Sequence, residues 1–193
     1  MPADRQELKR RAEAATTADT SRGLNYTTLF ALVTDHLGPD AARQVDVLGK
    51  GRRVDFFSYP IGEYLETAWN AVDRLEPTFG TTEAVLIELG RRTATSFLDS
   101  MIGRTLLTVS GHDPRRLIAS TGSGYRSAVS YGERHHEFLG EKRARLTFRH
   151  DFMPAPFHSG VILAAMQATH ALRPRVEPQV RGLLDSDYLI EWD

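Results

Sequence analysis

The sequence contains no cysteine among its 193 residues. This absence excludes a disulfide framework, a thiolate metal site and a cysteine nucleophile. Long hydrophobic runs are also missing, since the longest candidate, SGVILAAMQA (159–168), has about half of the ~20 residues that a membrane span requires. The N-terminal stretch MPADRQELKRRAEAATTADTSRG lacks the apolar core of a signal peptide. We therefore expect no membrane span and a cytoplasmic location.

An excess of basic charge is missing as well. Lys and Arg together number 24, against 25 for Asp and Glu, whereas nucleic-acid-binding domains usually carry a basic excess. We therefore expect no nucleic-acid partner. The chain also lacks a supported Ser/His/Asp arrangement, a His-Glu-x-x-His motif and a dinucleotide fingerprint. These absences predict a protein that is not an enzyme, with no catalytic residue, no cofactor and no metal.

Helical periodicity runs through the N-terminal part of the chain. It is clearest in SYPIGEYLETAWNAVDRL (58–75), where apolar residues recur at i, i+3, i+4 and i+7 after Pro60. In the longest predicted helix, Gly90 and Gly103 lower the helix propensity and allow either close helix packing or a break. The remaining predicted helices cover residues 3–15, 25–37, 39–49, 83–110 and 113–120.

Alternation replaces this period over residues 125–152, which is typical of strands. The predicted inner face carries Ala144, Leu146, Phe148 and His150, and the outer face carries Arg143, Arg145, Thr147 and Arg149. Residues 154–172 predict a helix, and RVEPQV (175–180) predicts an edge strand because Pro178 lacks an N–H donor. The tail DYLIEWD (187–193) predicts a final strand, buried in a small antiparallel sheet with Trp192 against a helix.

Helices and strands are thus segregated, which predicts an α+β fold. An N-terminal helical half is followed by a small antiparallel sheet with one crossing helix. We assign residues 1–22 to an N-terminal charged helix and linker, and residues 23–193 to a single α+β domain.

The densest group of ligand-type side chains is His135-His136-Glu137. Adjacent strand residues point to opposite faces, and zinc requires three or four convergent ligands, so a solvent-exposed hairpin is the plainer interpretation. His150-Asp151 could pair a base with an orienting carboxylate. Neighbouring strand residues diverge, however, and this favours a structural role for both.

Other polar candidates lie in a glycine-rich stretch and among the arginines. TGSGYRS (121–127) could cradle a phosphate through backbone N–H groups, but it lacks Walker spacing and a lysine, which favours a flexible loop. Arg116, Arg126 and Arg145 are candidate contacts for an anionic ligand; the alternative is a solvated face paired with glutamates. His158, near a predicted helix start, is interpreted as structural.

The C-terminal part has the order strand, Phe-x-x-Gly opening a helix, and two closing strands: ARLTFRHDF, APFHSGVILAAMQATHAL, RVEPQV and DYLIEW. This order resembles a superfamily that contains the haem-NO-binding (H-NOX) sensor domains, the four-vinyl-reductase-type ligand domains and core subunits of the TRAPP tethering complex. Upstream, ELGRRTATSFLDSM resembles the H-NOX helix entered by a Leu-Gly pair. The chain is also similar to a myxobacterial paralogous family of uncharacterised proteins of nearly this length. That similarity rests on Tyr59-Pro60, Leu89-Gly90, the central hairpin and Phe157-x-x-Gly160.

The resemblance departs from H-NOX where haem would bind. The H-NOX pattern has a proximal His after the central helix, whereas this chain has RRLIASTGSGYRSAV there, without a His. The Tyr-x-Ser-x-Arg motif for the haem propionates is replaced on the strand by FRHDF. A vinyl-reductase-type metal site would require cysteine. We therefore expect the ligand not to be haem.

Three interpretations of function remain, and an enzyme is the least favoured because nothing beyond titratable residues supports one. The first is a non-catalytic cytoplasmic ligand-binding or regulatory domain for an unknown small molecule, with a pocket between the helical half and the sheet. The candidate pocket residues are Tyr64, Trp69, Phe97, Phe148 and Phe157, and the same side chains would equally form the core. The alternative is a protein–protein interaction or dimerisation scaffold resembling TRAPP subunits, with a protein partner or a homodimer. Edge strands and an exposed helix face would serve that role.

Overall fold

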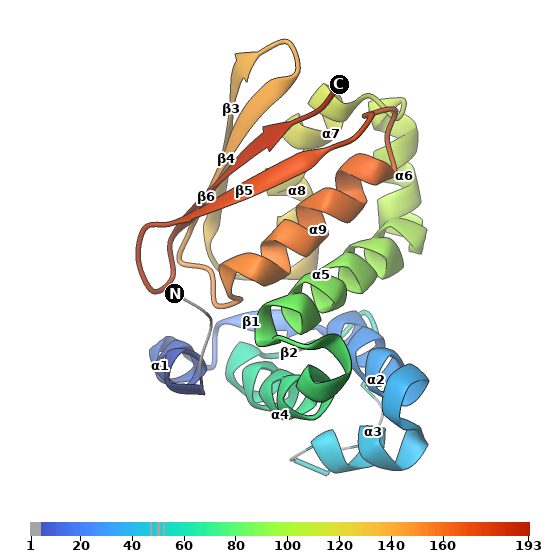
Figure 1. Ribbon diagram of the computed structural model, residues 1–193, viewed down its shortest axis with the longest axis vertical. Helices are drawn as coiled ribbons and strands as arrows, with labels where there is room; N and C mark the ends of the chain where they lie inside the picture. The colour runs from blue at the N-terminus through green and yellow to red at the C-terminus, as the bar shows by residue number, and fades with distance from the viewer. Residues whose placement is uncertain (1–4, 47, 50, 52) are drawn as a thin grey trace.

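The computed structural model describes residues 5–46, 48–49, 51 and 53–193 (Figure 1). The helices are α1 (Arg5–Ala14), α2 (Gly23–Leu37), α3 (Pro39–Val45), α4 (Ile61–Phe79), α5 (Thr82–Asp99), α6 (Met101–Ser110), α7 (Pro114–Ala119), α8 (Thr121–Ala128) and α9 (Ala155–Gln167). The strands are β1 (Thr20–Arg22), β2 (Ser58–Pro60), β3 (Glu133–Gly140), β4 (Arg143–Arg149), β5 (Arg175–Val180) and β6 (Ser186–Glu191). Within this part of the chain, none of the helices is both long and apolar enough to cross a membrane.

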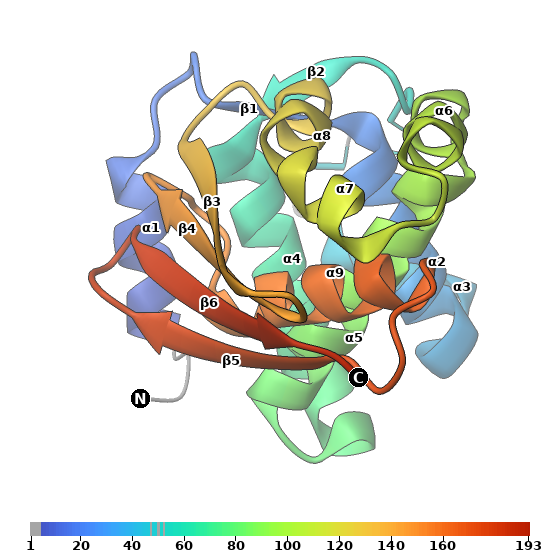
Figure 2. The same ribbon diagram turned by 90° about the horizontal axis from the view of Figure 1, so that it is seen from above.

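The main sheet is antiparallel, with the strand order β3-β4-β6-β5. Helices α7, α8 and α9 lie on one of its faces (Figure 2). Helix α5 packs against α9 and joins this layer to the remaining helices, while β1 and β2 form a separate pair (Figure 1). The predicted α+β fold, with a helical half followed by a small antiparallel sheet and one crossing helix, is confirmed.

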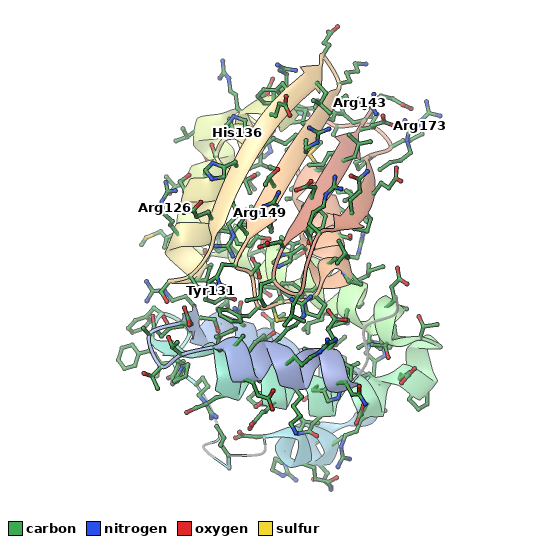
Figure 3. The ribbon with its side chains drawn as sticks, turned by 90° about the vertical axis from the view of Figure 1, so that its left-hand side faces the viewer. Arg126, Tyr131, His136, Arg143, Arg149 and Arg173 are labelled. Carbon is green, nitrogen blue, oxygen red and sulfur yellow. The ribbon has the colours of Figure 1, made fainter. Side chains whose placement is uncertain are left out.

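Strand β4 shows why helices cover only one face of the sheet. Ala144, Leu146 and Phe148 are buried against the helices, whereas Arg143 and Arg149 lie on the opposite face of the sheet (Figure 3). The prediction that His150 continues the inner face is wrong. The strand ends at Arg149, and His150 is an exposed residue with a φ of 54°, so its left-handed backbone ends the alternation.

The tail is buried, as predicted. Strand β6 pairs with β4 on one side and β5 on the other, so the final strand lies inside the sheet. Tyr188 and Ile190 are fully buried, and Trp192 belongs to the same apolar cluster as Ile162 and Met166 of α9. Strand β5, which contains Pro178, lies at the edge of the sheet, and this confirms the predicted edge strand.

Helices α5 and α9 cross at two glycines. A Cβ placed on Gly90 would lie 1.9 Å from the carbonyl oxygen of Phe157, and one on Gly160 would lie 2.0 Å from that of Ile87. Only glycine allows two helix backbones to approach this closely. The Leu-Gly and Phe-x-x-Gly pairs of the sequence therefore meet each other, and their contact joins the helical half to the sheet.

The helix predicted over residues 83–110 is divided in two. Ser100 has an extended backbone, and its Oγ accepts a hydrogen bond of 3.2 Å from the amide of Gly103, which caps α6. A Cβ on Gly103 would lie 2.1 Å from the carbonyl oxygen of Phe97, so this glycine lets α6 start directly against the end of α5. Gly103 marks a break and Gly90 a close crossing, the two outcomes that the sequence allowed.

The glycine-rich stretch is helix α8, and its predictions as a flexible loop or the start of a strand are wrong. The amide of Gly124 donates to the carbonyl oxygen of Ser120, so the helix itself uses N–H groups that a phosphate cradle would need. Packing overrides the local pattern here, because α8 lies against β3 and Tyr125 meets Phe148 edge to face, with 5.0 Å between ring centroids.

The N-terminal segment packs onto the rest of the chain. Helix α1 lies against α4, and Arg11 is 2% exposed. Its Nη1 donates to the carbonyl oxygens of Asp151 at 3.1 Å and Met153 at 3.3 Å. The stretch 16–23, predicted as a linker, contains β1, which pairs with β2. Helix α1 and β1 thus belong to the same packed body as residues 23–193.

Candidate functional site

A cavity of about 370 Å³ lies where α5, α6, α8 and α9 come together beside β1. Its wall is predominantly apolar and includes Phe97 of α5, Leu106 of α6, and Phe157 and Val161 of α9. The break at Ser100 turns α6 away from the axis of α5, so that α6 can form one wall (Figure 1). The volume and the apolar wall are those of a small-molecule site.

The cavity reaches solvent on one side. Of its lining residues, Phe56 is 71% exposed and Ile102 is 52% exposed. The charged lining residues are Arg22 and Asp55. Arg22 already donates to the carbonyl oxygens of Phe56 at 2.6 Å and Ser127 at 3.1 Å, and Asp55 accepts 2.6 Å from Thr27 Oγ1. Both charges therefore hold the rim of the cavity together.

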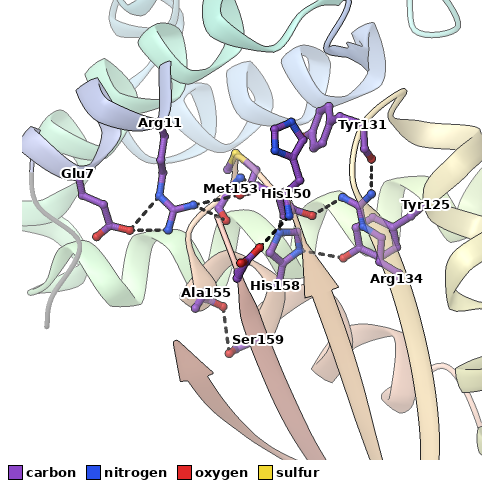
Figure 4. A network of polar contacts seen from close by, with 12 residues as sticks. Glu7, Arg11, Tyr125, Tyr131, Arg134, His150, Met153, Ala155, His158 and Ser159 are labelled. Carbon is purple, nitrogen blue, oxygen red and sulfur yellow. Dashed lines mark hydrogen bonds and ion pairs between the residues drawn. The ribbon is translucent and has the colours of Figure 1, made fainter. Parts of the chain in front are cut away.

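A buried polar cluster forms part of the inner wall (Figure 4). Asp151 lies at its centre and pairs with Arg134, and both side chains are less than 5% exposed. The carboxylate also accepts from the Met153 amide at 3.0 Å and lies 2.9 Å from Nε2 of His158. Nδ1 of His158 lies 2.9 Å from the hydroxyl of Tyr125. His158 and Tyr125 both line the cavity, so the cluster connects a buried carboxylate to the cavity through an imidazole and a phenol.

Electrostatics determine the charges of Asp151 and Tyr125, which are the first and last groups in this series of contacts. Burial alone would raise the pKa of Asp151, but His158, Arg134 and the Met153 amide together hold that pKa well below its usual range. Burial raises the pKa of Tyr125 well above its usual value, and the nearby Asp151 charge adds to the rise. Asp151 is therefore an anion and Tyr125 a neutral phenol.

The neighbours of His158 also assign the protons of its ring. Nε2 lies 2.9 Å from the Asp151 carboxylate, an electrostatic contact outside hydrogen-bond geometry, so a ring with a single N–H carries it at Nε2, and Nδ1 then accepts the O–H of Tyr125. The guanidinium of Arg134 lies 4.8 Å from the centre of the Tyr125 ring and helps to hold it in place. The phenol oxygen keeps a lone pair for a group inside the cavity.

The predicted aromatic residues are divided between cavity and core. Phe97 and Phe157 line the cavity. Tyr64 is fully buried in the helical half, 5.1 Å from the Tyr26 ring centroid. Phe148 is fully buried behind the wall, with its ring centroid 5.0 Å from that of His158. Trp69 lies on α4 beside a surface groove formed with α1.

The predicted anion contacts lie on different surfaces. Arg116 of α7 and Arg126 of α8 are exposed on the helices. Arg145 lies on the outer face of the sheet and pairs with Glu137 at 2.9 Å. The structure does not bring these three side chains together at the cavity.

The histidines of the hairpin are exposed. His135 and His136 lie on β3, and His135 is 3.4 Å from Glu133. No group of three or more His, Asp or Glu side chains within the described residues could hold a metal ion. Of the His150-Asp151 pair, only Asp151 reaches the site, where its partner is His158.

Sequence reasoning missed the contact between Tyr125 and His158, which are 33 residues apart. The only local signal is Asp151, two residues after the end of β4, followed by His158 in the first turn of α9. A haem held through an axial histidine does not fit this wall. His158 is the only imidazole among the described lining residues, and each of its nitrogens lies 2.9 Å from a partner.

Comparison with known proteins identifies a family that matches the chain and solved structures that share its fold. The family described as "Protein of unknown function (DUF2378)" matches residues 14–193. The chain is similar to an Fe(II) unliganded H-NOX protein mutant from K. algicida, with a TM-score of 0.70 and 15% identity over 89% of this chain and 96% of that one. It is equally similar to an H-NOX protein from S. oneidensis in the Fe(II)NO ligation state, with a TM-score of 0.70 and 13% identity over 89% and 99%. Such identities show the fold alone. Comparison with curated proteins gives no match.

Proposed function

This chain belongs to the family described as a protein of unknown function (DUF2378), and we propose that it is a non-catalytic, cytoplasmic ligand-binding domain with a regulatory role. The observation that carries this proposal is the preformed apolar cavity of about 370 Å³, whose inner wall holds one organised polar cluster. A few placed polar groups on an apolar wall are what small-molecule sites use for orientation. The H-NOX fold of a relative solved in the Fe(II)NO ligation state supports the proposal by analogy.

The ligand in this proposal is not haem. Coordination by His158 would require the ring to give up its contact with Asp151 or with Tyr125. Releasing the buried carboxylate from one of its partners costs about 1–3 kcal/mol. Added haem should therefore give neither a protein-bound absorption band nor a complex in native mass spectrometry.

The polar cluster also supports a binding role rather than catalysis. A nucleophilic hydroxyl needs an environment that favours loss of its proton, whereas burial raises the pKa of the Tyr125 hydroxyl well above its usual value. The cluster orients a neutral phenol and does not activate it.

The experiment compares binding of an apolar fluorescent dye to the wild type and two variants. Ala165 lines the cavity on α9, so Ala165→Phe should fill it and lower dye affinity about tenfold or more. The control Gln167→Phe places the same side chain on an exposed position of α9 and should bind the dye as the wild type does. Circular dichroism and thermal unfolding establish that both variants fold. Equal dye binding by all three folded proteins would refute the proposal.

A second candidate function is a dimerisation or protein-interaction scaffold, as the TRAPP resemblance implies. Helix α6 favours it, because Met101 is 83% exposed and Val109 is 74% exposed. Light scattering across a concentration series tests this function: the wild type should form a dimer that Met101→Lys disrupts. A monomer at all concentrations would contradict the dimer.

A further inference from the structure

At the cavity, the phenol oxygen of Tyr125 can still accept one hydrogen bond, and this acceptor specifies the ligand. We propose that the ligand is a neutral, mainly apolar molecule that donates one hydrogen bond, from a hydroxyl or an N–H group, to the phenol oxygen of Tyr125. His158 and Asp151 act as positioning residues that set the direction of this bond. The inference rests on the proposed function, because it names the ligand class of the same cavity.

The direction of the hydrogen bond follows from the contacts behind Tyr125. Nε2 of His158 faces the Asp151 carboxylate at 2.9 Å, which favours the tautomer with its N–H at Nε2, and in that tautomer Nδ1 accepts the proton of the Tyr125 hydroxyl. A phenol that has committed its only proton can interact with a further group only as an acceptor. A ligand atom that contacts Tyr125 in this state must therefore bring the proton itself.

The charge of the ligand follows from the charges of the wall. Asp151 and Arg134 compensate each other within the protein, and Arg134 does not line the cavity. The charged lining residues, Arg22 and Asp55, belong to the rim and are engaged there. An anion at Tyr125 would therefore be buried near the Asp151 carboxylate without a cation of its own, and burying an unpaired charge is costly.

A second polar atom supports a hydroxyl as the donating group. Oγ1 of Thr93, on the α5 side of the cavity, is buried and has no hydrogen-bond partner among the described residues. A ligand hydroxyl can donate to the acceptor at Tyr125 and still accept a hydrogen bond itself, and Thr93 would serve as its donor only after a rotation of the side chain that exposes Oγ1. The rest of the lining is predominantly apolar and suits a hydrocarbon body.

The test uses three probes built on an eight-carbon chain. Octanol can donate a hydrogen bond, its methyl ether can only accept one, and octanoate carries a negative charge. Calorimetry with the full chain should show octanol binding about 5- to 30-fold more tightly than either analogue. Hexanol and decanol, each with its own ether, guard against a poor fit of one chain length.

Two tyrosine variants locate the preference. Tyr125→Phe removes only the hydroxyl of the proposed acceptor and should make octanol and its ether bind equally. Tyr131→Phe, the same change at another cavity-lining tyrosine, should keep the preference. His158→Gln should weaken the preference without removing the phenol, which separates a positioning role from a direct contact.

The outcomes distinguish this inference from the proposed function. If no probe of any length binds the wild type, both are wrong. If the probes bind without a preference for the alcohol, or if octanoate binds most tightly, the cavity is a ligand site and the inference about Tyr125 is wrong. Loss of the preference in Tyr131→Phe but not in Tyr125→Phe would also overturn the assignment to Tyr125.

Discussion

The structure contains the same buried arrangement twice, once in the helical half and once at the cavity. In the helical half, Arg53 pairs with Asp46 and lies 4.8 Å from the centre of the Tyr26 ring, with the Arg53 side chain 2% exposed. At the cavity, Arg134 pairs with Asp151 and lies 4.8 Å from the centre of the Tyr125 ring, with its side chain 3% exposed. Both carboxylates are thus neutralised by an arginine that stacks on a tyrosine.

The difference between the two arrangements is a histidine. The Asp46–Arg53 pair is part of the packing of the helical half, and neither residue lines the cavity. Asp151 also contacts His158, and His158 in turn contacts the hydroxyl of Tyr125 at the cavity wall. A buried ion pair is weak evidence for function by itself. The Arg134–Asp151 pair is a candidate for a functional role because the imidazole of His158 connects it to the cavity.

The largest expected effect comes from removing the two carboxylates separately. Asp151→Ala leaves Arg134 buried without its partner and should lower the free energy of unfolding by about 3–5 kcal/mol in urea denaturation. Asp46→Ala should also destabilise the fold, through Arg53. Only Asp151→Ala should abolish the alcohol preference at temperatures where both variants are folded. An equal loss of preference in both variants would erase the distinction between the two pairs.

The next effect concerns glycines in the same two regions. Gly90→Ala places a methyl group against the Phe157 carbonyl and should cost about 1–3 kcal/mol or more, while moving α9 against the cavity. Gly62→Ala, on α4 of the helical half, meets nothing within 4 Å and should stabilise the protein by about 0.5–1 kcal/mol. Urea denaturation and dye binding measure both effects. If Gly90→Ala binds the dye as the wild type does, the close α5–α9 crossing does not shape the cavity.

A smaller effect is expected from pH. Because the folded pKa of Asp151 is depressed, its contribution to stability is complete above its unfolded pKa of about 3.9 and is lost as the pH falls through the folded pKa. The wild type should therefore lose stability on acidification below about pH 5 more steeply than Asp151→Asn does. Asp187→Asn is the comparison variant: burial raises the pKa of this carboxyl, but contacts with Arg181 and Arg149 outweigh burial and lower it, so this variant should flatten the acid slope less than Asp151→Asn does. Identical acid slopes for the wild type and Asp151→Asn would contradict the ionised carboxylate.

The smallest effect belongs to the outer face of the sheet. Arg145 and Glu137 form an exposed ion pair, and such pairs contribute about 0–1 kcal/mol. Arg145→Ala should leave the thermal midpoint almost unchanged and should not alter the binding of octanol or octanoate. A clear loss of octanoate binding would restore Arg145 as an anion contact.

The parts of the fold that sequence predicts are those with a regular local period. Alternation in β4 and β6 placed Leu146 and Tyr188 on the buried face, and Trp192 was expected against a helix, where it lies. The α8 helix was missed, because its polar residues gain their helical state from packing on β3. His150 was placed on the inner face because a single residue with a positive φ is invisible to periodicity.

The candidate site shows the same limit more strongly. Phe97 and Phe157 were expected in the pocket and line the cavity, while the Tyr125–His158 contact joins two helices across a hairpin and has no local signature. From the sequence, the one pairing that suggests itself for Asp151 is with the neighbouring His150, and the divergence of adjacent strand residues favours a structural role for both. Long-range packing, which brings α8 and α9 to the same cavity wall, selects His158 instead.

If the proposed function is right, the cavity holds a small molecule other than haem. Native mass spectrometry of the purified full chain, compared with its denatured mass, tests this most directly, with octanol added to an otherwise empty sample. We expect a mass above a whole number of chains for the wild type and for Gln167→Phe, and a bare mass for Ala165→Phe. A bare wild-type mass in the presence of octanol, or an excess equal to the mass of haem, would contradict it.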